Sequence, residues 1–136
     1  MPVFLAAWFM LATTPAWAEW VAVGGSDVSV VYVDPVDSAI SHKIGHKNGN
    51  LTRAWVLQDW KVRRRDGVLS HRSLAEFDCA QGRSRTLSFA AYSGPMATGT
   101  ILSFSDTAGN WMYLSAPGTV GESLVRFVCH PSEHAL

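Results

Sequence analysis

Residues 117–129 read PGTVGESLVRFVC and predict a capped helix that ends on a cysteine. Thr119 and Glu122 have the T-x-x-E spacing of a capping box, in which each side chain accepts a hydrogen bond from a backbone amide near the start of the helix. Apolar residues then recur along a single stripe, at Val120, Leu124, Phe127 and Val128. His130-Pro131 ends the helix. We therefore expect a C-terminal helix whose apolar stripe packs on a core.

Upstream of this helix, the sequence predicts short strands separated by turns. The strand-like runs are residues 20–23, 28–34, 51–61, 73–79, 85–93, 101–104 and 111–114. Turn signals include Asn48-Gly49, Asp66-Gly67 and Gly94-Pro95. Because the connections are short, we expect antiparallel pairing. The predicted fold is α+β: a single antiparallel β-sheet of about five or six strands, with one C-terminal helix packed on it and one disulfide.

Simple alternation assigns the side chains of two strands to faces. In the run 73–79, one face carries Ala75, Phe77 and Cys79, and the other carries Leu74, Glu76 and Asp78. In the run 85–93, one face carries Leu87, Phe89 and Ala91, and the other carries Thr86, Ser88 and Tyr92.

Residues 1–18 have the anatomy of a secretory signal peptide. Residues 3–12 are almost wholly apolar, Pro15 follows them, and Ala16-Trp17-Ala18 has the small-x-small pattern after which signal peptidase cleaves. A membrane anchor is the alternative, but a spanning helix needs about 20 apolar residues and this run is shorter. We expect residues 19–136 to form the mature domain. Because the mature chain would begin with Glu19 rather than a cysteine, we expect it to be soluble and unlipidated.

The charge balance argues against a nucleic-acid partner. The chain of 136 residues carries eleven Lys and Arg against eleven Asp and Glu, whereas nucleic-acid binding rewards a strong basic excess. The same balance argues against a general membrane-surface role. Residues 19–136 have the length of one ordinary domain with its own core.

The chain has two cysteines, Cys79 and Cys129. In an exported protein we expect them to form a disulfide that joins the helix to a strand. Closing a loop of about 50 residues would stabilise the fold by roughly 4 kcal/mol in the loop-entropy model. A metal or redox pair is the alternative, but the sequence has no C-x-x-C motif.

Short segments spread in order over nearly the whole mature chain carry a family resemblance. They are Trp20-Val21, Val31-Tyr32-Val33-Asp34, Arg53-Ala54-Trp55-Val56-Leu57, Glu76-Phe77-Asp78-Cys79, Tyr92-Ser93-Gly94-Pro95-Met96, and Pro117-Gly118-Thr119-Val120-Gly121-Glu122 running on to Cys129. In order and spacing they resemble the surface-adhesin protein E family of bacterial envelope proteins. The resemblance implies an antiparallel sheet with a C-terminal helix, a structural Cys79–Cys129 bond, and adhesion to host matrix or plasma glycoproteins.

One feature of the chain departs from the adhesins of this family. Those members are outer-membrane lipoproteins, whereas the expected mature start of this chain has no cysteine to carry a lipid. We therefore expect a periplasmic or secreted protein, and association with the cell surface stays open.

A single run of positive charge is formed by Lys61, Arg63, Arg64 and Arg65. This run would bind an anionic partner such as a phosphate, a sulfated glycan or an acidic protein patch; a solvated turn between two strands is the alternative. Arg83 and Arg85 would extend the run if the two adjacent turns lay at the same end of the sheet. These six residues are the candidate partner-binding patch.

Two other segments carry candidate sites for small ligands. Tyr92 and Met96, on either side of Gly94-Pro95, would line a small pocket; packing in the core is the alternative. His42 and His46, like His130 and His134, have the i, i+4 spacing that zinc sites use on helices. Neither pair has an obvious third ligand, so we interpret them as solvated histidines and predict no metal site.

The sequence predicts no catalytic residue and no cofactor. Glu76 and Asp78 alternate along one strand face and would suit acid–base work as a carboxylate pair. We favour instead a solvent-facing edge with basic cross-strand partners such as Arg85. The sequence has no G-x-S-x-G motif and no Cys-His pair free of the disulfide.

Two functions from different classes remain. The leading hypothesis is an exported, non-enzymatic binding protein whose rigid sheet presents a loop such as 61–67 to a protein or glycoprotein partner. The alternative is a soluble periplasmic protein that is envelope-associated or binds a small ligand and has no host role. We also consider a homodimer formed by pairing of sheet edges.

Overall fold

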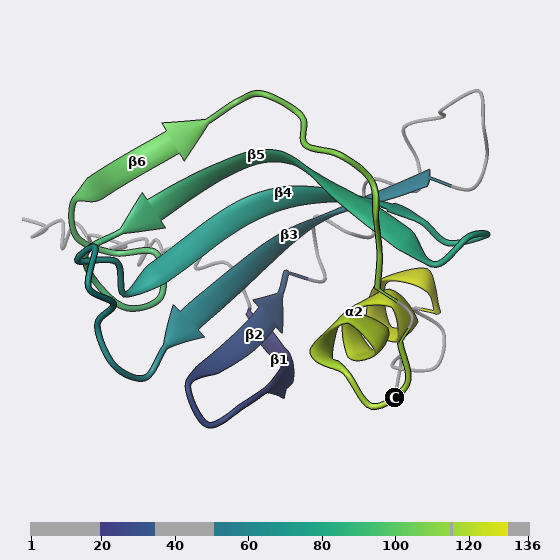
Figure 1. Cartoon of the computed structure of the whole chain (residues 1–136), viewed down its shortest axis with the longest axis horizontal. Coiled ribbons are helices and arrows are strands. Elements are labelled where there is room, and N and C mark those ends of the chain that lie inside the picture. Colours follow the sequence, from purple (N-terminus) through teal and green to yellow (C-terminus); the bar gives the residue numbers. More distant parts are fainter. Residues whose placement is uncertain (1–19, 35–50, 115, 131–136) are drawn as a thin grey trace, which may run out of the picture.

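The computed structural model describes residues 20–34, 51–114 and 116–130 of the chain. They form one antiparallel sheet with a helix at the C-terminal end (Figure 1). The elements in chain order are β1 (Val21–Gly25), β2 (Ser29–Val33), β3 (Leu51–Trp60), β4 (Ser70–Asp78), β5 (Arg83–Tyr92), β6 (Ile101–Ser105), β7 (Met112–Tyr113) and α2 (Val120–Cys129). The predicted α+β fold is confirmed.

The sheet is a meander in which each strand pairs with the next one along the chain. In the described part of the chain, six strands follow the order β1-β2-β3-β4-β5-β6, and the short β7 pairs with the first residues of β5. The end of β3 pairs with the start of β4, and the end of β4 pairs with the start of β5. The β3–β4 turn and the β4–β5 turn therefore lie at opposite ends of the sheet.

The helix α2 begins with the predicted capping box. The Thr119 hydroxyl oxygen accepts a hydrogen bond from the Glu122 amide at 3.2 Å, and the Glu122 carboxylate accepts one from the Gly118 amide at 2.7 Å. Glu122 also pairs with Arg126 one turn later, at 2.8 Å. At the other end, the His130 amide donates to the Arg126 carbonyl at 3.1 Å and closes the last turn.

The apolar stripe of α2 covers one half of one face of the sheet. The core beneath it consists of Val33, Ala54, Ala75, Phe77 and Val128. Phe77 and Val128 are 1% and 2% exposed, and Leu124 and Phe127 pack against the same cluster. The covered half is the one at which β4 ends, because α2 contacts β1, β3 and β4 there.

The disulfide joins Cys79, directly after β4, to Cys129, the last residue of α2. The two Cα atoms are 5.6 Å apart, a separation typical of disulfides. The predicted bond is confirmed, and it fixes the C-terminal end of the helix to the edge of the core.

The strand β5 departs from regular alternation at Leu87. Leu74 lies opposite Ser88, but the next residue, Ala75, lies opposite Thr86, so Leu87 is the extra residue of a β-bulge. The prediction that Thr86 and Phe89 lie on opposite faces is therefore wrong. Both side chains point to the face that carries α2, because the bulge reverses the alternation between them.

The other face of the central strands carries a row of ion pairs. Glu76 is 2% exposed; its carboxylate accepts from Arg53 Nε at 3.2 Å and from Arg85 at 2.8 and 3.0 Å. Asp78 pairs with Arg83 at 3.0 Å. The expected cross-strand partner Arg85 is confirmed, but the expected solvent-facing edge is wrong, because both carboxylates are buried and paired with arginines.

Arginine stacking adds to this row of ion pairs. The guanidinium groups of Arg83 and Arg85 each lie 4.7 Å from the centre of the Trp111 ring. Burial alone would raise the pKa of Glu76, but the hydrogen bonds and charges of Arg85 and Arg53 hold that pKa below its usual value. The carboxylate therefore stays ionised and holds three neighbouring strands together.

Replacing this carboxylate gives a pH-dependent test. Because the folded pKa of Glu76 is depressed, its stabilisation is present above the unfolded pKa and is lost as the pH falls through the folded pKa. Glu76→Gln should lower the free energy of unfolding by about 1–3 kcal/mol at pH 7, since it leaves two arginines without their shared partner. The difference from wild type should shrink as the pH falls below about 4, which urea unfolding across pH 3–7 would measure.

Asp106→Asn is the matched control for Glu76→Gln, because Asp106 is an exposed carboxylate in the loop after β6. This substitution should change the free energy of unfolding by less than about 0.5 kcal/mol at every pH. An equal loss for both variants at pH 7 would show that the Glu76 network does not stabilise the fold.

Candidate functional site

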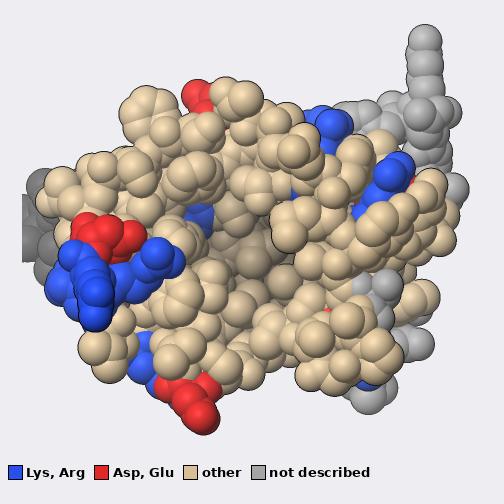
Figure 2. Space-filling model, in the orientation of Figure 1, with Lys and Arg blue, Asp and Glu red and all other residues tan. Residues whose placement is uncertain are grey.

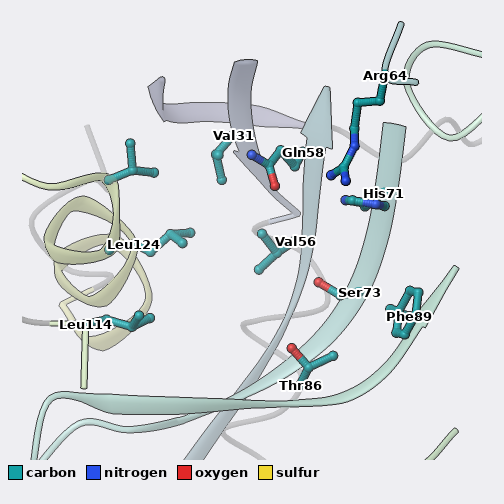
Figure 3. A pocket seen from close by; sticks show the side chains of 12 residues that line it. Val31, Val56, Gln58, Arg64, His71, Ser73, Thr86, Phe89, Leu114 and Leu124 are labelled. Carbon is teal, nitrogen blue, oxygen red and sulfur yellow. The ribbon is translucent and has the colours of Figure 1, made fainter. Parts of the chain in front are cut away.

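A groove lies on the half of the sheet face that α2 leaves uncovered. Its volume is about 610 Å³, within the range of roughly 300–1,000 Å³ that small-molecule sites occupy. In Figure 2 the surface is hollowed at the centre of this face, and Figure 3 shows the side chains that line the hollow. The lining comes from β2, β3, β4, β5, the start of α2, and the segments next to these elements.

Cross-strand pairing places the floor of the groove. Val31 in β2 lies opposite Gln58 in β3, which lies opposite His71 in β4. In the adjacent row, Val56 in β3 lies opposite Ser73 in β4, which lies opposite Phe89 in β5. Because directly opposite residues share a face, these two rows form one continuous surface. The bulge at Leu87 adds Thr86 to the same surface.

The first turn of α2 and the segment after β7 close one side of the groove. Leu114 passes so close to Gly121 that a Cβ added there would lie 2.8 Å from the Leu114 carbonyl oxygen. Only glycine allows this approach without displacing the backbone. Leu114 and Leu124 thereby form an apolar wall on this side of the groove (Figure 3).

The other end of the groove is aromatic and cationic. The rings of Trp60, His71 and Phe89 meet edge to face, with centroids 6.2 and 6.5 Å apart. Arg64 lies over the Trp60 ring at 5.0 Å, and Figure 3 shows its guanidinium directed toward His71. Burial, followed by the charge of Arg64, lowers the pKa of His71, and Asp66 opposes this shift. His71 is therefore mainly uncharged at neutral pH.

The candidate basic patch is divided by the fold. Lys61 and the arginines 63–65 lie in the β3–β4 turn, whereas Arg83 and Arg85 begin β5 at the opposite end of the sheet. The condition for a single patch is therefore not met. Figure 2 shows one gathering of Lys and Arg at the end of the molecule where β3 leads into β4, apart from the other positive groups.

Members of the basic run differ in how they are held. Arg63 donates to the carbonyl oxygens of Gly67 and Ser93 and so ties two loops together. Arg64 contacts Trp60 and lines the groove, while Lys61 and Arg65 are exposed on the surface of the turn.

The pocket expected at Tyr92 and Met96 is not the groove, because neither residue lines it. The loop after β5 is instead a tightly bonded turn. The Met96 amide donates to the Asp59 carboxylate at 2.8 Å, and the Ala97 amide donates to the hydroxyl of the fully buried Ser70 at 2.9 Å. The positive φ angles of Met96 and Ala97, 53° and 58°, are held by these bonds.

The histidine pairs considered as metal ligands are not joined by further ligands in the described residues. These residues contain no group of three or more His, Cys, Asp or Glu placed to hold a metal ion. His42, His46 and His134 lie outside the described residues.

No helix in the described part of the chain has the length and apolar character needed to cross a membrane. The edge strand β6 exposes Ile101, Leu102 and Phe104, and the homodimer stays a prediction.

Sequence reasoning did not find the groove. Its lining residues come from four strands, a turn and a helix, and no sequence motif connects them. The sequence of β5 gave a weak indication of a polar groove floor, because hydroxyl residues alternate there with apolar ones. The strand is also long enough to contain a bulge. The bulge itself leaves no mark in the sequence.

Comparison with known proteins agrees with this architecture. Two solved structures of Haemophilus influenzae protein E have the same fold. One of them, crystal form II, has a TM-score of 0.54 at 10% identity over 80% of this chain and 92% of that chain. The other has a TM-score of 0.56 at 12% identity over 86% of this chain and 88% of that chain. At such identities the likeness shows the fold alone.

No curated protein matches the chain. The family model of surface-adhesin protein E, however, matches residues 20–130, a range that includes the sheet, the helix and both cysteines of the disulfide. The chain therefore belongs to the surface-adhesin protein E family.

Proposed function

We propose that this protein is an exported, non-enzymatic adhesin that binds a protein or glycoprotein partner through the exposed charges of the β3–β4 turn. Membership of the adhesin E family supports the class of function. The candidate contact surface is residues 61–67, and their position in a turn at one end of the long central strands supports this proposal.

The observation that carries this proposal is a cationic turn held in a fixed shape. The Trp60 amide donates to the Leu69 carbonyl, the Arg64 amide to the Val68 carbonyl, and the Val68 amide to the Asp66 carboxylate, at 2.9, 2.9 and 3.1 Å. Arg63 adds its bonds to Gly67 and Ser93. A preorganised surface loses little conformational entropy when a partner binds.

The groove supports a binding function rather than catalysis. The described residues that line the groove include His71 but no carboxylate and no cysteine. Asp66 is near enough to raise the pKa of His71 through its charge, but it pairs with Arg64 and does not line the groove. The described lining therefore offers neither the second carboxylate of acid–base catalysis nor a nucleophile–base pair with a thiol. The buried carboxylates of Glu76 and Asp78 are held by arginines on the opposite face, and this arrangement suits structure rather than proton transfer.

Binding of a small ligand is the second candidate function, and the groove is the observation that favours it. The groove is formed by paired strands and by a helix that a disulfide joins to the sheet. The two candidate functions use adjoining surfaces that share Arg64, and they do not exclude each other.

Export gives the first test. If residues 1–18 are a signal peptide, the protein recovered from the periplasm or the culture medium should begin at Glu19. N-terminal sequencing or intact-mass measurement would show this directly. Recovery of a chain that begins at Met1 would contradict export by a cleaved leader.

The turn gives the second test. Lys61→Gln combined with Arg65→Gln should weaken binding of the purified domain to an immobilised matrix glycoprotein by about fivefold at low salt, and the difference should shrink as salt rises. Surface plasmon resonance would measure both effects. Neither substitution disturbs a buried group, because both residues are exposed.

A control variant with the same change in net charge keeps this test specific. Gln81→Glu combined with Thr107→Glu removes two units of net charge at exposed positions outside the β3–β4 turn. This control should bind like wild type. Equal binding by all three proteins would show that the β3–β4 turn is not the contact surface.

A further inference from the structure

The charged groups around the groove select the kind of ligand that would fit it. Among the described residues that line the groove, Arg64 carries the one formal charge, and none is Asp or Glu. Asp66 pairs with Arg64 at 3.4 Å, but the two side chains are 43% and 52% exposed. An exposed pair of this kind is weak and leaves other guanidinium N–H groups available to a ligand.

The opposite side of the groove is apolar. Leu114 and Leu124 form the wall there, and Val31 and Val56 are apolar residues of the floor next to it (Figure 3). Burying an apolar chain against such a wall is favourable by roughly 0.8 kcal/mol per CH₂ group. The groove thus has an apolar side and a cationic end within a single volume of about 610 Å³.

We propose that the groove binds a single-chain amphiphile with a carboxylate head, of the fatty-acid class. Its hydrocarbon chain lies against Leu114, Leu124 and Val56, and its carboxylate accepts hydrogen bonds from Arg64. This inference rests on the second candidate function, small-ligand binding, and specifies its ligand class.

Hydrogen-bonding groups on the floor are compatible with this orientation. Within the described residues, the hydroxyls of Ser73 and Thr86 make no side-chain hydrogen bond. They lie between the apolar wall and the Arg64 end (Figure 3). Water or a polar substituent on the chain can satisfy them without displacing the carboxylate from Arg64.

The test compares octanoate with 1-octanol, which has the same chain length and no charge. Each would be titrated, below its aggregation concentration, into the ¹⁵N-labelled domain 19–136. Octanoate should perturb the amides of β3, β4 and the first turn of α2, and should bind about tenfold tighter than 1-octanol, because a charge-assisted hydrogen bond to Arg64 is added.

Variants locate the two parts of the ligand. Arg64→Gln should weaken octanoate binding about tenfold and leave 1-octanol binding unchanged. Arg65→Gln, the neighbouring exposed arginine outside the groove, is the matched control and should change neither. Thr86→Phe, at an exposed floor position, fills the groove and should abolish binding of both compounds. Amide spectra of each variant check that the fold is kept.

The outcomes separate the ligand class from the candidate function. If 1-octanol binds in the groove as tightly as octanoate, the carboxylate assignment is overturned while small-ligand binding survives. If neither compound perturbs the groove, small-ligand binding by this groove fails together with the ligand class. Perturbations confined to the exposed apolar strand β6 would also overturn the proposal. If a variant fails to fold, the comparison of octanoate with 1-octanol on the wild-type domain still tests the ligand class.

Discussion

The packing of α2 on half of one sheet face is the constraint on which the rest of the structure depends. Its apolar stripe meets Phe77 and the small residues Ala54 and Ala75, which let the helix approach the strands closely. The bond between Cys79 and Cys129 holds the end of the helix at the place where β4 ends. A ten-residue helix covers only part of a face that the strands β3 and β5, also ten residues long, extend well beyond. The uncovered remainder is the groove.

The two faces of the central strands have different roles. One face carries the helix, the groove and the core cluster around Phe77 and Val128, whereas the other carries the buried Leu57, the ion pairs of Glu76 and Asp78, and the arginines that stack on Trp111. Because Glu76 bridges Arg53 on β3 and Arg85 on β5, it stabilises the curved centre of the sheet from outside the core. A sheet fixed from both faces can present its turns and its groove without first rearranging.

Local patterns in the sequence predicted most of the fold. The capping box of Thr119 and Glu122, the strand alternation and the cysteine pair each depend on neighbouring residues or on a simple count, so they could be read directly. Burial of Glu76 could not, since it depends on arginines from two other strands. The bulge at Leu87 also escaped prediction, because a single extra residue changes the face of Thr86 without changing composition.

The candidate site was predicted less well than the fold. The basic run could be recognised in the sequence, but the different positions of its arginines could not. Arg63 ties two loops together, and Arg64 lines the groove. Arg83 and Arg85 lie at the far end of the sheet, where they pair with carboxylates. A site assembled from several strands and a turn depends on tertiary geometry. Its chemistry could be named only after the strands were placed in register.

The most direct test of the central claim is native-state amide hydrogen exchange on the oxidised domain, with α2 compared to β4. If the helix is an integral part of the core, amides near Val128 should open with the same free energy as amides near Phe77, within about 1 kcal/mol. Replacing both cysteines by serine should lower the protection of the helix more than that of the strands. Exchange of the helix amides at a free energy several kcal/mol below that of β4, with the disulfide intact, would contradict the account.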